Sequence, residues 1–185
     1  MAHTIRAILD GDIPFVTRVY NWAIVNSLAH FGTSLVTEDG VRADWLLGRS
    51  GFPWLLAEIG GEPAGFAKAG PFRTREAYAW TAELTVYLLP HAHGQGVGKA
   101  LYSRLLEVAK AQGFRLVLGG VAQPNPASEA LHRSVGMVEM GRFPASGFKF
   151  GQWIDVTFFG IEFFDSTRRP APIRPVREVD PAYPW

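Results

Sequence analysis

Apolar and polar residues alternate along several stretches of the chain, a spacing that is typical of β-strands. The predicted strands are 4–9, 53–59, 63–69, 78–89, 115–122, 138–143 and 153–163. We expect 78–89 to be the longest strand. Its alternation places two sets of residues on opposite faces: Glu83, Thr85 and Tyr87 on one, and Leu84, Val86 and Leu88 on the other.

Apolar residues at intervals of three and four predict helices between these strands. A first helix begins near Asp10 or Asp12, which can cap it, and continues to about residue 27. Further helices are predicted at 38–48, at 99–112 and from the turn at 124–126 through 134. The segment 26–37 is expected to be a loop.

The last segment of the chain differs in composition from the rest. Residues 165–185 are rich in proline and arginine, a composition that disfavours regular structure. We therefore divide the chain into one domain, 1–164, and a tail, 165–185, which we expect to lie extended on the surface or on a partner.

Composition narrows the class of protein. A chain of 185 residues with 48% hydrophobic and 19% charged residues fits one globular domain. A net charge of +1 gives no basis for attraction to nucleic acid or to a membrane surface. The absence of cysteine excludes disulfides, thiolate catalysis and zinc–cysteine sites. Without a membrane span or a signal-peptide pattern, we expect a soluble cytoplasmic protein.

A glycine-rich stretch, His93-Gly94-Gln95-Gly96-Val97-Gly98-Lys99, joins a predicted strand to a predicted helix. Free backbone amides and the helix dipole make such a junction an anion site, so we expect a cofactor that carries phosphate. The Walker pattern is excluded because it needs Gly where His93 stands and Ser or Thr where Ala100 stands. The dinucleotide fingerprint would need Gly in place of Lys99. The alternative is an ordinary glycine-rich turn.

The remaining pattern, a polar residue at His93 followed by Gly96 and Gly98, resembles the pyrophosphate loop of the GNAT N-acetyltransferases. That family usually has Arg or Gln where His93 stands. The family has a later helix motif, Asn-x-x-Ala-x-x-x-Tyr-x-x-x-Gly-Phe. Its positions are occupied here by Asn125, Ser128, His132, Gly136 and Met137, so that Ser replaces Ala and His replaces Tyr.

The closer resemblance is to the phosphinothricin and methionine sulfoximine acetyltransferases, which also place His at the Tyr position. It rests on the stretches 53–58, 69–71, 77–87, 124–132 and 147–156 and covers about residues 4–163. It implies an α+β GNAT fold, with a twisted, mixed and mostly antiparallel sheet of about seven strands and flanking helices. It also implies a homodimer.

The activity that this resemblance implies is transfer of acetyl from acetyl-CoA to the α-amino group of a small amino acid or analogue. No metal is implied, and His91 and His93 have no third ligand nearby in the sequence. Two alternatives stay open. One is acetylation of another amine, such as another amino acid or a peptide N-terminus, and the other is a non-catalytic module that binds acyl-CoA.

Catalysis needs a base for the amine and a proton or stabiliser for the leaving thiolate. By resemblance Glu83 is the base, or else it only pairs with an arginine. His132 is expected to relay a proton, because its ordinary pKa of about 6.5 suits that task, or else it is a packed residue.

The resemblance also assigns the binding residues. The cofactor-binding residues are expected to be Val86, Tyr87, Leu88, His93, Gly94, Gln95, Gly96, Val97, Gly98, Lys99 and Asn125. The backbone N–H groups of 86–88 can bind the cofactor only if this strand separates from a neighbouring strand and leaves them unpaired. Asn125 can alternatively cap a helix. The substrate-binding residues are expected to be Phe31, Arg73, Thr74, Arg75, Glu83, Leu84 and Thr85. Arg73 and Arg75 can pair with a carboxylate or be surface charges.

Overall fold

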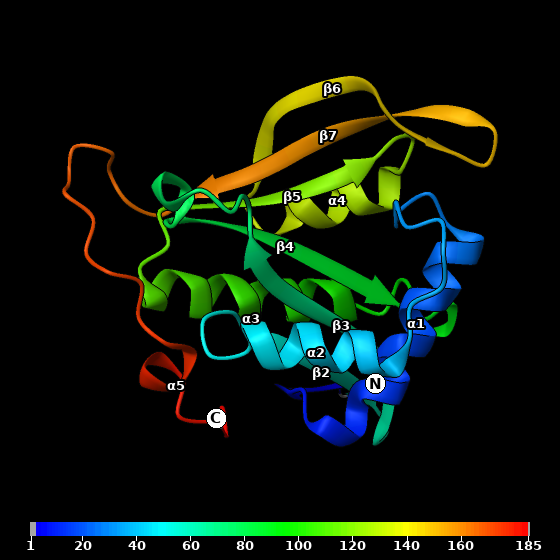
Figure 1. Ribbon diagram of the computed structural model, residues 1–185, viewed down its shortest axis with the longest axis horizontal. Coiled ribbons are helices and arrows are strands. Elements are labelled where there is room, and N and C mark those ends of the chain that lie inside the picture. The colour runs from blue at the N-terminus through cyan, green and yellow to red at the C-terminus, as the bar shows by residue number, and fades with distance from the viewer. Residues whose placement is uncertain (1–2, 185) are drawn as a thin grey trace.

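The computed structural model describes residues 3–184 and shows a seven-stranded sheet with helices on both faces (Figure 1). The strand order is β1-β2-β3-β4-β5-β7-β6, and all neighbours are antiparallel except β4 and β5. The predicted mixed, mostly antiparallel sheet is confirmed. The strands are β1 (His3–Ala7), β2 (Trp54–Ile59), β3 (Glu62–Pro71), β4 (Thr81–Leu88), β5 (Leu116–Ala122), β6 (Val138–Lys149) and β7 (Gln152–Glu162).

Most predicted helix bounds agree with the structure to within a few residues. The helices are α1 (Ile13–Asn26), α2 (Glu38–Gly48), α3 (Val97–Gln112), α4 (Pro126–Ser134) and α5 (Val176–Val179). The segment between α1 and α2 is irregular, as predicted.

The prediction that 78–89 is the longest strand is wrong. β4 has 8 residues because Glu76–Tyr78 form a 3-10 turn before it, whereas β6 has 12. The predicted strand 138–143 was too short. Pro144 and Gly147 break the alternation there, yet β6 continues past an irregularity in its pairing between Phe143 and Gly147.

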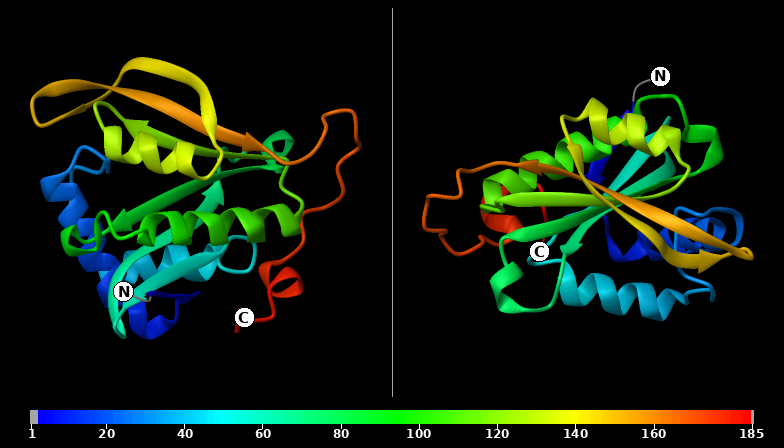
Figure 2. Two further views of the ribbon diagram at one scale, coloured as in Figure 1. Left: turned by 180° about the vertical axis from the view of Figure 1, so that it is seen from behind. Right: turned by 90° about the horizontal axis from the view of Figure 1, so that it is seen from above.

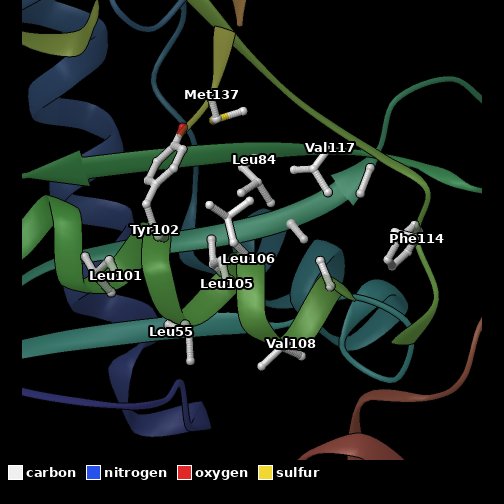
Figure 3. Packing of buried hydrophobic residues seen from close by; sticks show 14 of the residues in the cluster. Leu55, Leu84, Leu101, Tyr102, Leu105, Leu106, Val108, Phe114, Val117 and Met137 are labelled. Carbon is white, nitrogen blue, oxygen red and sulfur yellow. The ribbon is translucent and has the colours of Figure 1, made fainter. Parts of the chain in front are cut away.

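Two helical layers enclose the sheet and give it a separate core on each face (Figure 2). On one face α3 packs Leu101 and Leu105 against Leu55 and Leu84 (Figure 3). On the other face α1 and α2 pack against a second cluster that includes Phe66. The strand pleat therefore turns Leu84 toward α3 and its neighbour Glu83 toward the other face.

The sheet opens between its two parallel strands. β4 pairs with β5 only at Thr81, Ala82 and Glu83. Beyond Glu83 the two strands diverge, while β4 stays paired with β3 as far as Leu88 (Figure 1). Within residues 3–184, the backbone edge of β4 that faces β5 therefore has no strand partner along its second half, which is the separation that binding by 86–88 requires.

The tail packs against the body of the protein. Regular structure within it is limited to α5, but Val176 and Tyr183 are buried in the same core as α3. The Gln112 side chain donates to the carbonyl of Arg174 at 2.9 Å. Arg104 on α3 lies 2.5 Å from the carboxylate of Asp180, whose side chain is only 6% exposed.

We expect Asp180→Asn to lower the free energy of unfolding by about 1–3 kcal/mol, because it removes the buried carboxylate charge that pairs with Arg104. Arg104 also contacts Glu107 at 3.1 Å, but that carboxylate is 66% exposed. Glu107→Gln is therefore the matched control, with a cost below about 0.5 kcal/mol. Denaturant unfolding measures both. Equal losses of unfolding free energy in the two variants would contradict the conclusion that packing of the tail stabilises the fold.

Candidate active site

The glycine-rich loop ends in a left-handed residue at the start of α3. Gly96 is the N-cap of α3, with φ of +80°, and no side chain caps the helix. A Cβ at Gly96 would meet no atom within 4 Å, so its backbone conformation, and not lack of space, favours glycine. The first amides of α3 thus remain open to an anion.

A cavity of ≈ 540 Å³, here called the loop cavity, adjoins this helix start. Of the predicted cofactor-binding residues, it is lined by Val86, Tyr87, Leu88, His93, Gly94, Gly96, Val97, Gly98, Lys99 and Asn125. Gln95 is not among them, and its side chain donates to the carbonyl of His91. The cavity thus joins the unpaired half of β4 to the amides of α3.

Two helices complete the loop cavity with residues that sequence reasoning missed. From α1 and the segment after it come Val19, Trp22, Ala23, Asn26, Ser27 and Ala29, and from α4 come Ala127, Ser128, Ala130, Leu131 and Ser134. Asn125 caps α4 by accepting from the amide of Ser128 at 3.1 Å. That bond uses its oxygen and leaves its NH₂ group as a donor for a ligand.

A second cavity of ≈ 410 Å³, here called the Glu83 cavity, adjoins the first at Ala29, which lines both. It is lined by Ala29, Phe31, Arg73, Glu83, Gly120, Ala122, Phe143, Ser146, Val156 and Phe158. Among predicted substrate residues it contains Phe31, Arg73 and Glu83. Thr74, Arg75 and Thr85 do not line it, and Leu84 lies in the core, only 2% exposed.

The side chain of Glu83 is half-buried and lines this second cavity. Burial raises the pKa of Glu83 above the ordinary value, and the positive charge of Arg73 partly opposes that rise. A carboxylate with a raised pKa accepts protons at higher pH than an exposed one. Within residues 3–184, Arg73 is the only cationic side chain that lines the Glu83 cavity.

His132 lies apart from Glu83. It is 2% exposed and lines neither cavity. Its Nδ1 lies 2.7 Å from the carbonyl of Ser128 and its Nε2 3.1 Å from the hydroxyl of Tyr102. Since a carbonyl only accepts, Nδ1 carries the proton and Nε2 accepts from Tyr102. Burial lowers the pKa of His132, although the bond to Ser128 opposes this.

The backbone of β5 separates these two groups. A Cβ at Gly119 would lie 2.5 Å from Nε2 of His132, whereas a Cβ at Gly120 would lie 3.7 Å from a carboxylate oxygen of Glu83. Because successive strand residues face opposite ways, His132 and Glu83 occupy opposite faces of the sheet.

The described part of the chain, 3–184, contains no cluster of three or more His, Asp or Glu residues that could hold a metal ion. The Nε2 atom of His93 lies 3.3 Å from the carbonyl oxygen of Leu88.

Within residues 3–184, no helix has the length and apolar character that crossing a membrane requires.

The sheet divides beside an uncapped helix start where two cavities adjoin, and this architecture is that of the N-acetyltransferases. The chain belongs to the acetyltransferase (GNAT) family, whose sequence model matches residues 16–137. The resemblance inferred from the motifs is thereby confirmed.

Individual relatives are similar over nearly the whole chain. The phosphinothricin N-acetyltransferase of Streptomyces viridochromogenes is 38% identical over 175 residues, which are 95% of this chain and 93% of that protein. The L-methionine sulfoximine/L-methionine sulfone acetyltransferase of Salmonella typhimurium is 34% identical, covering 86% of this chain and 94% of that one.

Solved structures of acetyltransferases are also similar to this chain over most of its length. A Salmonella typhimurium structure described as a putative acetyltransferase with its cofactor acetyl-CoA has a TM-score of 0.87 and 32% identity, covering 92% of this chain and 99% of the other. A phosphinothricin acetyltransferase from Sinorhizobium meliloti, in complex with acetyl-CoA, has a TM-score of 0.86 and 32% identity, covering 92% and 94%.

Proposed function

We propose that the protein transfers acetyl from acetyl-CoA to the α-amino group of a small amino acid or analogue, of the phosphinothricin or methionine sulfoximine type. The amine attacks the thioester directly and Glu83 acts as the base. The observation that carries this proposal is the placement of a half-buried carboxylate in a cavity that adjoins the loop cavity where β4 and β5 separate.

The loop cavity fits the cofactor. The open amides at the start of α3 and the charge of Lys99 suit its diphosphate. The unpaired backbone of 86–88 suits the pantetheine amides and the acetyl carbonyl, and the NH₂ group of Asn125 suits the pantetheine. When bound, acetyl-CoA supplies the acetyl group as an activated thioester.

The Glu83 cavity fits an amino acid. Glu83 takes a proton from the substrate ammonium, directly or through one water, and leaves the amine nucleophilic. Arg73 pairs with the α-carboxylate, while Phe31, Phe143 and Phe158 surround the side chain. A proton relay through His132 stays a prediction, because both ring nitrogens already contact groups within the protein.

We expect Arg73→Gln to raise KM for α-amino acids by roughly tenfold, through loss of a charged hydrogen bond to the carboxylate. It removes the positive charge that lowers the pKa of Glu83, so the acidic limb of kcat/KM moves to higher pH. Initial rates over a pH series measure both. Arg75→Gln, outside the cavity, is the comparison variant, and equal effects of the two would contradict this assignment.

An amine panel tests the function itself. Thiol release from acetyl-CoA should accelerate with small α-amino acids. Methionine sulfoximine should be preferred to phosphinothricin, because Arg73, the one cationic lining residue within 3–184, is engaged by the α-carboxylate and cannot also balance a phosphinate. Faster thiol release with other amines or peptide N-termini than with small α-amino acids favours an acetyltransferase for another amine. Tight cofactor binding without any thiol release favours a non-catalytic module that binds acyl-CoA.

Homodimerisation and a cytoplasmic location also stay predictions, tested by light scattering and cell fractionation.

A further inference from the structure

Lys149, at the end of β6, is buried although no carboxylate pairs with it within residues 3–184. The residue is 5% exposed. Its ammonium donates to the carbonyl of Ser27 at 2.8 Å and to that of His30 at 2.6 Å. Both carbonyls belong to the irregular segment between α1 and α2, here called the α1–α2 loop (27–37). One side chain thus joins two segments that lie far apart in the sequence.

A second contact between the same two segments lies beside the first. A Cβ at Gly147 on β6 would lie 2.3 Å from the ring of Phe31, so this ring rests on bare backbone. Gly147 has no left-handed φ, so glycine serves here to admit the ring rather than to permit a turn. The contact is part of the Glu83 cavity, since Phe31 lines it.

The other hydrogen bonds at this end of the α1–α2 loop are mostly local. The amide of Ala29 donates to the hydroxyl of Ser27, and that of Gly32 donates to Nδ1 of His30. The hydroxyl of Tyr87 reaches the carbonyl of Ala29 at a long 3.5 Å. The short hydrogen bonds from the sheet to residues 27–31 therefore come from Lys149, beside the ring contact of His30 with Tyr87.

We propose that Lys149 is a positioning residue for the amine substrate: it fastens the α1–α2 loop to β6 and so holds Phe31 as a wall of the Glu83 cavity. This inference rests on the proposed function of that cavity. Lys149 lines neither cavity, so it acts through the loop. Burial of its ammonium lowers its pKa, a cost that the two carbonyl bonds offset.

Lys149→Met is the first test. We expect KM for the amino acid to rise roughly tenfold while KM for acetyl-CoA changes less than about threefold. Lys149→Arg, which keeps the charge and the donors, should recover part of the loss. Lys110→Met is the matched control, because Lys110 is an exposed lysine on α3. Hydrogen exchange should become faster at residues 27–31 of Lys149→Met without a change in Tm.

Gly147→Ala tests the same wall from the other side and leaves Lys149 in place. The added methyl displaces the ring of Phe31, so KM for the amino acid should rise. The double variant Phe31→Ala with Gly147→Ala should be no worse than Phe31→Ala alone. Gly141→Ala on the same strand is the control, since a Cβ there meets nothing within 4 Å.

The outcomes separate this inference from the proposed function. Unchanged amine KM and unchanged exchange in Lys149→Met, with an active wild type, overturn the positioning role. Equal rises in both KM values overturn it too. A wild type that acetylates no amine, with faster exchange in Lys149→Met, overturns the proposed function and leaves the fastening of the loop supported.

Discussion

Glu83→Gln should lower kcat by about 10²- to 10⁴-fold, the usual contribution of a positioned general base. Glutamine keeps the shape of the side chain but cannot take a proton from the ammonium. Affinity for acetyl-CoA should stay within about threefold of wild type, because Glu83 does not line the loop cavity. Thiol-release kinetics and cofactor titration measure the two quantities separately.

The pH profile gives this substitution a second readout. A base acts when deprotonated, so activity falls as the pH falls through its pKa. Burial raises the pKa of Glu83, so the wild-type loss begins at a higher pH than an exposed glutamate would give. Glu83→Gln should lack this acidic limb, while Glu107→Gln on the exposed side of α3 should keep it. A kcat within threefold of wild type for Glu83→Gln would assign the base elsewhere.

Gly96→Asp should reduce the affinity for acetyl-CoA by at least about 100-fold. Aspartate tolerates the left-handed conformation that Gly96 adopts, so the loop can keep its shape. Its carboxylate, however, stands at the start of α3, where it repels a diphosphate and competes for the same amides. An acidic residue there also interacts favourably with the helix dipole, which offsets part of the strain of a side chain at this left-handed position, so Tm should fall only slightly.

Gly96→Asn is the matched control for that charge. Asparagine tolerates the same backbone conformation and is almost the same size, but it is neutral. We expect it to weaken acetyl-CoA binding far less than aspartate, by isothermal titration at one ionic strength. Equal losses for the two variants would mean that bulk, and not charge, disturbs the loop. Unchanged affinity in both would place the diphosphate elsewhere.

Local sequence patterns predicted the strand and the glycine-rich turn that form one contiguous part of the candidate site. Glu83, the second half of β4 and the loop through Lys99 follow one another along the chain, so alternation and glycine spacing sufficed to place them. The helix at 38–48 was predicted with the bounds that α2 has, and in the structure Thr37 caps its first turn by accepting from the amide of Gly40.

The opposite wall of the Glu83 cavity was not predictable in this way. Gly120, Phe143 and Phe158 come from three strands that meet only through pairing of β5, β6 and β7. No local spacing signals such a meeting. The prolines of the tail similarly suggested an extended surface segment, whereas Val176 and Tyr183, spaced between those prolines, supply buried side chains to the core.

The common boundary of the two cavities at Ala29 constrains the order of chemical events. Under the proposed function, donor and acceptor would occupy the two cavities at the same time, and the amine would attack the thioester directly within a ternary complex. Such a direct transfer would proceed without an acetylated side chain as an intermediate, and the sequence offers no cysteine for one.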